Sequence, residues 1–201
     1  SCFKDGGMIT EPKWKSLAAS TTDPLFTPSQ CQDIIRVGHQ QKSKKATVGH
    51  DGGKQGKYDA KMRVTTISWI PFKAMPEMYR ILDRTMKQVN GNYFGYEGME
   101  ITEYAQFTEY PKGGYYNWHM DAEVNCQFEP PVRKISMTLL LSDPSEFEGG
   151  ELEFLTEGNK PKQLIQGQAI FFCSLLRHRV AKVKKGVRRS LVMWFGGPPF
   201  K

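Results

Sequence analysis

The chain has 201 residues, of which 39% are hydrophobic and 24% are charged, and its net charge is +7. This composition is typical of a globular protein and excludes a largely disordered chain. The length is sufficient for a hydrophobic core that needs no disulfide or structural metal. No apolar run approaches the roughly 18 residues of a membrane span, so we expect no membrane partner. The first ten residues also lack the charged and then apolar order of a signal peptide.

The cysteines are few and far apart, at Cys2, Cys31, Cys126 and Cys173. The absence of a CxxC pair argues against a cysteine zinc site, and the small number argues against a disulfide scaffold. Cys173 follows the apolar run 169–172, so we expect it to be a buried free thiol. Together these features favour a reducing, cytoplasmic location.

The positive charge is concentrated in two segments, residues 41–63 and residues 177–189. The second segment contains no acidic residue. A solvated basic surface is the default interpretation of such segments. The alternative is an attraction for nucleic acid or for an anionic substrate.

Two helices are predicted in the first half of the chain. Residues 1–26 suggest an irregular arm, after which Thr27 as N-cap, Pro28 and Gln30 predict a helix that runs to Gly38. Residues 41–61 are polar and rich in lysine and glycine, which predicts a long loop. A strand is expected over 64–70. An amphipathic helix is expected over 76–89, ended by the Asn90-Gly91 pair.

From Met99 onward the hydrophobic pattern has a period of two, which predicts strands. Turn signals rich in Gly, Pro, Asn and Asp separate the candidates. The expected strands are 99–108, 115–121, 134–141, 151–155, 163–172, 178–183 and 187–195. The predicted fold class is therefore α+β, mostly β: a β-sandwich or open barrel with helices packed outside.

Three features of this β-rich half point to chemistry. His119 and Asp121 are two residues apart on an expected strand, so their side chains should project from one face. His178 opens a later strand, and Arg188 follows ten residues further on. Two histidines and one carboxylate form the facial triad of non-haem Fe(II) oxygenases, which leaves three metal positions open. Each residue taken alone is more often a core or surface residue.

The segment 99–194 resembles the catalytic core of the Fe(II)/2-oxoglutarate-dependent dioxygenases, in particular the prolyl 4-hydroxylase-like, PKHD-type branch. The motifs that carry the resemblance are His119-Met120-Asp121, Arg133-Lys134-Ile135-Ser136, Leu141-Ser142-Asp143-Pro144, Phe147-Glu148-Gly149-Gly150-Glu151-Leu152, Gly167-Gln168-Ala169-Ile170-Phe171-Phe172, and His178-x-Val180 through Gly186-x-Arg188-x-Ser190 to Trp194. The resemblance implies a double-stranded β-helix, or jelly roll, with a metal inside its open end. It also implies one dioxygenase domain over 1–201, with helical support and the basic loop in 1–98 and the catalytic barrel in 99–197.

The same resemblance implies roles for individual residues. His119, Asp121 and His178 would bind Fe(II), and Arg188 would bind the distal carboxylate of 2-oxoglutarate with help from Ser190. A forked guanidinium suits a carboxylate independently of the resemblance. Four further residues have an implied role beside an equally acceptable structural one: Tyr110 and Thr138 near 2-oxoglutarate, and Tyr116 and Trp194 near the substrate. Strand alternation directs Arg189 away from the pocket, and we expect it to be exposed.

The implied activity is a peptidyl prolyl 4-hydroxylase-like reaction that uses O2 and 2-oxoglutarate and produces succinate and CO2. Ascorbate is the implied reductant. The expected partner is a proline-containing peptide or protein, and the loop 41–61 would close over it as a lid. The alternatives are a hydroxylase of a free amino acid or other small molecule and, more distantly, a non-enzymatic basic barrel that binds nucleic acid. The sequence does not indicate an oligomeric state.

Overall fold

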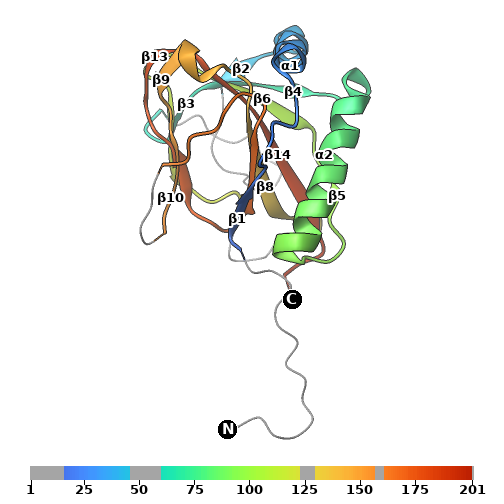
Figure 1. Ribbon diagram of the computed structural model, residues 1–201. Coiled ribbons are helices and arrows are strands. Elements are labelled where there is room, and N and C mark those ends of the chain that lie inside the picture. The colour runs from blue at the N-terminus through green and yellow to red at the C-terminus, as the bar shows by residue number, and fades with distance from the viewer. Residues whose placement is uncertain (1–15, 46–59, 123–129, 157–160, 201) are drawn as a thin grey trace, which may run out of the picture.

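The computed structural model describes residues 16–45, 60–122, 130–156 and 161–200 (Figure 1). The described strands form three antiparallel sheets, which confirms the mostly β architecture. The large sheet has the order β1 (Ala18–Ser20), β11 (Ala169–Cys173), β8 (Val132–Leu140), β14 (Arg188–Gly197), β6 (Ala105–Tyr110), β4 (Thr66–Ile70) and β2 (Lys44–Lys45), with β5 (Glu100–Ile101) paired to β14. The small sheet has the order β10 (Leu152–Phe154), β12 (His178–Val180), β7 (Tyr115–His119) and β3 (Arg63–Val64), and β13 (Val183–Gly186) pairs with β9 (Phe147–Gly149).

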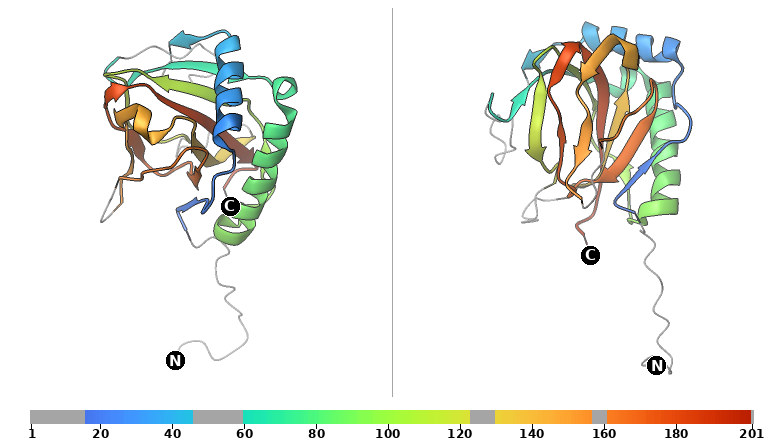
Figure 2. Two further views of the ribbon diagram at one scale, coloured as in Figure 1. Left: turned by 45° about the horizontal axis from the view of Figure 1, so that its top comes forward. Right: turned by 60° about the vertical axis from the view of Figure 1, so that its left-hand side comes forward.

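The large and small sheets face each other as the two halves of a jelly roll (Figure 2). A hydrophobic cluster joins them, with Leu140, Ile170 and Phe172 from the large sheet and Leu152 and Val180 from the small sheet. The double-stranded β-helix expected from the sequence is therefore the observed fold.

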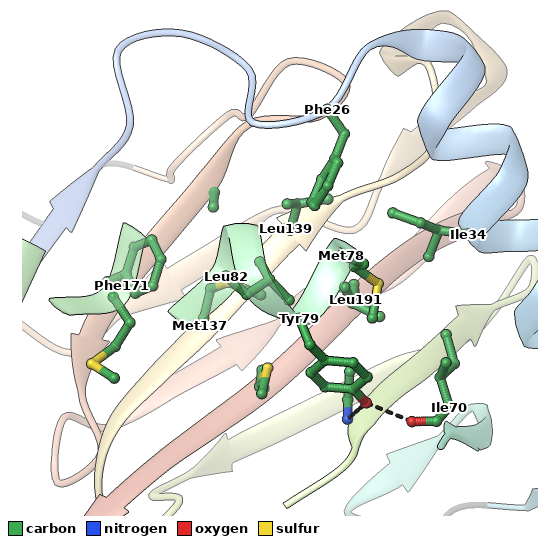
Figure 3. Packing of buried hydrophobic residues seen from close by; sticks show 14 of the residues in the cluster. Phe26, Ile34, Ile70, Met78, Tyr79, Leu82, Met137, Leu139, Phe171 and Leu191 are labelled. Carbon is green, nitrogen blue, oxygen red and sulfur yellow. Dashed lines mark hydrogen bonds between the residues drawn. The ribbon is translucent and has the colours of Figure 1, made fainter. Parts of the chain in front are cut away.

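The outer face of the large sheet carries the main hydrophobic core. Leu139, Phe171 and Leu191 point outward from β8, β11 and β14 and join residues of the helices α1 (Pro28–Gln40) and α2 (Pro76–Val89). Figure 3 shows this packing, with Leu82 of α2 placed among the outward side chains of the sheet. Because side chains alternate along a strand, the inner face is left to the intervening residues. On the central strands these are mostly polar: Gln106, Thr108, Ser136, Thr138 and Ser190, all of them buried.

The first helix begins as predicted and ends two residues later than expected. The Thr27 hydroxyl accepts a bond from the Gln30 amide (3.2 Å), and the Gln30 side chain accepts one from the Thr27 amide (2.9 Å). Gly38 does not end the helix, which continues to Gln40. Gly38 is needed for packing instead, because a Cβ atom there would lie 2.5 Å from the Phe107 ring.

The second helix spans Pro76–Val89, as predicted, but Asn90-Gly91 does not end the helical path. The chain continues through one π-helical turn, Asn90–Phe94, and leaves it at Gly95 with a left-handed φ of 71°. The Tyr79 hydroxyl of α2 donates to the Ile70 carbonyl and accepts from the Ala105 amide, so it fixes the helix to β4 and β6 (Figure 3).

Several predicted strands are shorter or divided. The strand expected over 64–70 divides at Thr65 into β3 and β4, which belong to different sheets. The strand expected over 99–108 divides into β5 and β6, and the strand expected over 178–183 divides into β12 and β13. The strand expected over 163–172 begins only at Ala169. The short strands β1 and β9 were not predicted, because their few residues carry no period and only the partner strand defines them.

Some predictions concern loops, thiols and spanning helices. Within the expected loop 41–61, Lys44–Lys45 forms the edge strand β2, while residues 46–59 and their expected lid role lie outside the described residues. Cys173 is a buried free thiol, as expected, and so is Cys31, whose pKa is raised by burial to about 11. Among the described helices, none is long and apolar enough to cross a membrane.

We predict that Gly38→Ala lowers the free energy of unfolding by about 1–3 kcal/mol, because the added methyl group collides with Phe107. The collision outweighs the helix propensity gained, which is about 1 kcal/mol. Gly91→Ala is the matched control, since nothing lies within 4 Å of its Cβ position. Chemical denaturation measures both, and a Gly38→Ala protein as stable as wild type would contradict the packing argument.

Candidate metal centre and cosubstrate pocket

Two histidines and one carboxylate meet between the sheets. His119 ends β7, His178 begins the neighbouring strand β12, and the two are direct partners in the strand register. The Nε2 atoms of His119 and His178 each lie 3.5 Å from a carboxylate oxygen of Asp121. All three ligand atoms lie within 4.8 Å of one another, which is compatible with one bound metal ion.

Asp121 reaches this cluster by a different route from the one that the sequence suggested. The strand β7 ends at His119, so the rule that residues two apart share a strand face does not place Asp121. The backbone amide of Asp121 donates instead to the Ser174 carbonyl (2.9 Å). Its carboxylate accepts from the Ser136 hydroxyl (2.7 Å), which also bonds to the Ser174 hydroxyl (2.9 Å). The large sheet therefore orients the carboxylate towards the two histidines.

Both histidines are fixed in the tautomer that metal binding requires. Nδ1 of His119 donates to the Asn117 carbonyl (2.7 Å), and Nδ1 of His178 donates to the Leu176 carbonyl (2.9 Å). Since these bonds place the proton on Nδ1, the Nε2 lone pairs face Asp121. Such backbone contacts commonly orient ligating histidines.

The charge states also suit a metal. Burial and the neighbouring His119 lower the pKa of His178, although Asp121 opposes the shift, so the imidazole is neutral. Burial acts to raise the pKa of Asp121, but His178, His119 and the Ser136 hydroxyl outweigh it and hold the pKa below its usual range. Two imidazoles and a carboxylate fit a divalent iron centre that keeps open positions.

Arg188 is the first residue of β14, and its side chain is buried in the same interior. It is 3% exposed, and its guanidinium donates to the Ser190 hydroxyl (3.2 Å) and lies 5.7 Å above the Tyr110 ring. Burial lowers the pKa of Arg188, with Tyr110 and Glu151 opposing the shift. No carboxylate of the described part of the chain forms an ion pair with Arg188. A buried guanidinium in this state is suited to an external carboxylate.

Thr138 and Ser190 extend the polar surface around Arg188. Thr138 is the register partner of Val192 and of Ile170, which places it on the inner face of the sheet. Ser190 pairs with Thr108 of β6, and all of these polar side chains are buried.

Arg189 points to the outer face, as expected, but it is not exposed. Its Nε donates to Glu109 (2.8 Å), and the same carboxylate contacts His39 of α1 (3.1 Å). The expectation of a free surface charge was wrong because α1 covers this part of the sheet.

Two aromatic residues complete the walls. The Tyr116 ring stacks on the His119 ring with centroids 3.4 Å apart and an interplanar angle of 9°. Burial raises the pKa of Tyr116 to about 12, so the phenol stays protonated. Trp194 is the register partner of Ser136, and the Arg133 guanidinium lies 3.9 Å above its ring. Eight of the nine residues singled out from the sequence therefore lie on the facing surfaces of the two sheets, and Asp121 lies just beyond the end of β7.

Sequence reasoning missed two arginines whose guanidinium groups lie over aromatic rings of this site. Arg133, which bonds to Glu103 through Nε (2.7 Å), was noted only as part of a motif. Arg63 was assigned to the basic surface segment 41–63, yet it is only 6% exposed and lies 4.3 Å above the Tyr116 ring. The apolar strand that begins directly after Arg63 was the only signal of its burial.

A jelly roll whose interior holds a two-histidine, one-carboxylate cluster and a buried arginine is typical of the class of mononuclear iron oxygenases. Residues 105–196 match the family model of the 2OG-Fe(II) oxygenase superfamily. The family that the sequence motifs suggested is thus supported over that segment, which is a little less than half of the chain.

Relatives of similar sequence are PKHD-type hydroxylases. One from Synechococcus sp. (strain CC9902) is 42% identical over 83 residues, which are 41% of this chain and 36% of that protein. Another from Parvibaculum lavamentivorans is 39% identical over 93 residues, which are 44% of this chain and 41% of that protein. The matched part thus spans about two fifths of the length of these relatives.

Solved structures share the fold at lower identity. A prolyl-4-hydroxylase from Pseudomonas putida superposes with a TM-score of 0.68 at 17% identity, covering 91% of this chain and 94% of that one. A viral collagen prolyl hydroxylase from Paramecium Bursaria Chlorella virus-1, solved with 2OG, gives a TM-score of 0.71 at 19% identity, covering 90% and 97%. These two structures share the fold over about nine tenths of this chain.

We predict that Asp121→Ala abolishes Mn(II) binding, because it removes the only carboxylate of the cluster. Ser136→Ala should weaken the same binding by roughly tenfold, since it frees the Asp121 carboxylate to rotate. Isothermal titration with Mn(II) under nitrogen measures both. Thr138→Ala is the control, because Thr138 does not belong to the cluster. Unchanged Mn(II) affinity in Asp121→Ala would refute the ligand assignment.

Proposed function

We propose that the protein is an Fe(II)- and 2-oxoglutarate-dependent hydroxylase of the prolyl 4-hydroxylase-like type. The observation that supports this most directly is the sharing of one interior by two groups. They are the His119–Asp121–His178 cluster and the buried Arg188, which has no ion pair in the described part of the chain. A metal and the distal carboxylate of 2-oxoglutarate are the matching ligands.

Different residues of the site bind the metal, bind 2-oxoglutarate and line the substrate side. His119, Asp121 and His178 hold Fe(II), which together with 2-oxoglutarate and O2 supplies the oxidising chemistry, with succinate and CO2 as products. Arg188 and Ser190 bind the distal carboxylate, and Tyr110 and Thr138 line the space beside it. Tyr116 and Trp194 wall the substrate side and exclude water from the reacting carbon.

A peptide is the preferred substrate class, and a prolyl residue the preferred target. Support comes from the names of the relatives and from a structural neighbour from Trichoplax adhaerens, a prolyl hydroxylase solved with a hypoxia inducible factor peptide fragment. The alternative, hydroxylation of a free amino acid or other small molecule, uses the same residues. The nucleic-acid alternative is weakened because Arg63 and Arg188, two members of the basic segments, are buried.

Three further assignments belong to this proposal. Residues 1–98 and 99–197 act as one domain, which the shared core of α1, α2 and the large sheet supports. The two buried free thiols agree with a reducing, cytoplasmic setting. Ascorbate serves as the reductant that restores Fe(II).

A turnover assay tests the activity. The protein is incubated with Fe(II), 2-oxoglutarate, ascorbate and a panel of proline-containing peptides, with free L-proline and other free amino acids alongside. We expect succinate, and the mass gain of one oxygen atom in a peptide. Oxygen gained only by a free amino acid would favour the alternative, and no succinate under any condition would refute the proposal.

We predict that Arg188→Ala raises the KM for 2-oxoglutarate, because a buried bidentate ion pair is lost at a cost on the order of 2–5 kcal/mol. Arg189→Ala is the matched control, since its neighbouring guanidinium bonds to Glu109 on the outer face. That control should leave the KM unchanged and lower only the melting temperature. Equal KM effects from both variants would contradict the assigned strand faces.

A further inference from the structure

A second buried guanidinium lies in the interior beside the metal cluster, and none of the roles above uses it. Arg63 belongs to β3, where it is the register partner of Tyr116 on β7. Its side chain crosses from the small sheet to the large one and donates to the Gln106 side-chain oxygen (3.0 Å). Gln106 lies on the inner face of β6, between the outward residues Ala105 and Phe107. The guanidinium is therefore held between the two sheets and not in solvent.

The hydrogen bonds of Arg63 are incomplete. Its Nε is buried and has no hydrogen-bond partner, and the bond that is made goes to a neutral amide. No acidic side chain within the described ranges forms an ion pair with it. A buried charge without an opposite charge destabilises the folded protein. Such a charge usually results when one member of a buried ion pair is absent. The expected partner is thus an anion that the described residues do not supply.

The position of Arg63 relative to the metal cluster limits where that anion lies. The imidazole of His119 stacks on one face of the Tyr116 ring, so the Arg63 guanidinium, 4.3 Å from the ring centroid, takes the other face. The order is therefore His119, Tyr116, Arg63. The Tyr116 ring thus separates His119 from Arg63. A substrate that reacts at the metal must pass the edge of this ring to reach Arg63.

A charge balance separates this anion from the cosubstrate. Under the proposed function, the charges of Fe(II) and Arg188 are matched by Asp121 and the two carboxylates of 2-oxoglutarate. The charge of Arg63 then has no counterpart among the described groups of this interior. Its forked donors suit a carboxylate better than a point charge would.

We infer that Arg63 binds a carboxylate of the substrate, so that the enzyme selects molecules with a carboxylate that reaches the side of the Tyr116 ring opposite His119. This inference rests on the proposed function and makes it more specific. The carboxylate has three possible sources: the α-carboxylate of a free amino acid, the C-terminus of a peptide, or an Asp or Glu side chain beside the target residue. All three present the same chemistry to Arg63.

Paired probes test the inference and distinguish the sources. The pairs are free L-proline and its amide, proline-ending peptides with a free or amidated C-terminus, and peptides with Asp or Asn beside proline. Each probe is titrated calorimetrically under nitrogen into protein loaded with Mn(II) and 2-oxoglutarate. In the pair that matches the natural source, we expect the carboxylate member to bind at least tenfold more tightly than the amide member. Equal affinities within every pair would overturn the inference.

Variants of Arg63 separate recognition from folding. Arg63→Gln should remove the preference within that pair by weakening only the carboxylate member, and Arg63→Lys should retain part of it. Arg179→Gln is the matched control, because Arg179 also stacks on an aromatic ring, Trp118, but already has a partner in Glu153. The wild-type comparison needs no variant, so misfolding of one variant leaves the test intact. A preference unchanged in both Arg63 variants would overturn the inference.

The same samples show which proposal fails. Succinate formed from 2-oxoglutarate without any substrate reports the proposed function and should persist in Arg63→Gln. The affinity for 2-oxoglutarate should also be unchanged in this variant, because Arg188 binds that carboxylate. If wild type forms succinate but shows no carboxylate preference, the role of Arg63 is wrong and the proposed function stands. If wild type forms no succinate under any condition, the proposed function itself is wrong.

Discussion

The large sheet is apolar on its outer face and largely polar on its central inner face, and the rest of the structure depends on this asymmetry. In a simple β-sandwich the inner faces form the core. Here α1 and α2 cover the outer face, and Leu139, Phe171 and Leu191 pack against them. Much of the burial of apolar area that stabilises the fold is therefore supplied outside the barrel, in addition to the smaller cluster between the sheets. The interior can then accommodate charged and polar groups.

Strand register organises most of the polar interior, with Asp121 as the exception. His119 and His178 are direct partners on adjacent strands, Arg188 is paired with Tyr110, and Trp194 is paired with Ser136. Ladder hydrogen bonds fix these positions, so side chains distant in sequence keep their spacing before any ligand binds. Such preorganisation limits the reorganisation that a reaction would otherwise require.

Charge is the second organising feature of this interior. Two guanidinium groups, Arg63 and Arg188, are buried without an ion pair to any described residue, while Asp121 is surrounded by histidines and a hydroxyl. Buried cations without partners are unfavourable unless something else compensates them. Their burial in one interior is consistent with the anionic ligands proposed for them.

The sequence by itself determined the fold class, the metal cluster, Arg188 and its neighbours on β14. Strand periodicity and the order of His119, Asp121, His178 and Arg188 are patterns that can be recognised in the sequence without a structure. Only the tertiary structure decided the position of Asp121, which lies beyond the end of β7 and is held by Ser136 and Ser174 from distant segments. The same holds for Arg63, which follows a lysine-rich segment and becomes buried only because β3 joins β7 while β4 joins β6. Burial of a charged side chain depends on which sheets its neighbours enter, and that is set by pairing between segments far apart in the chain.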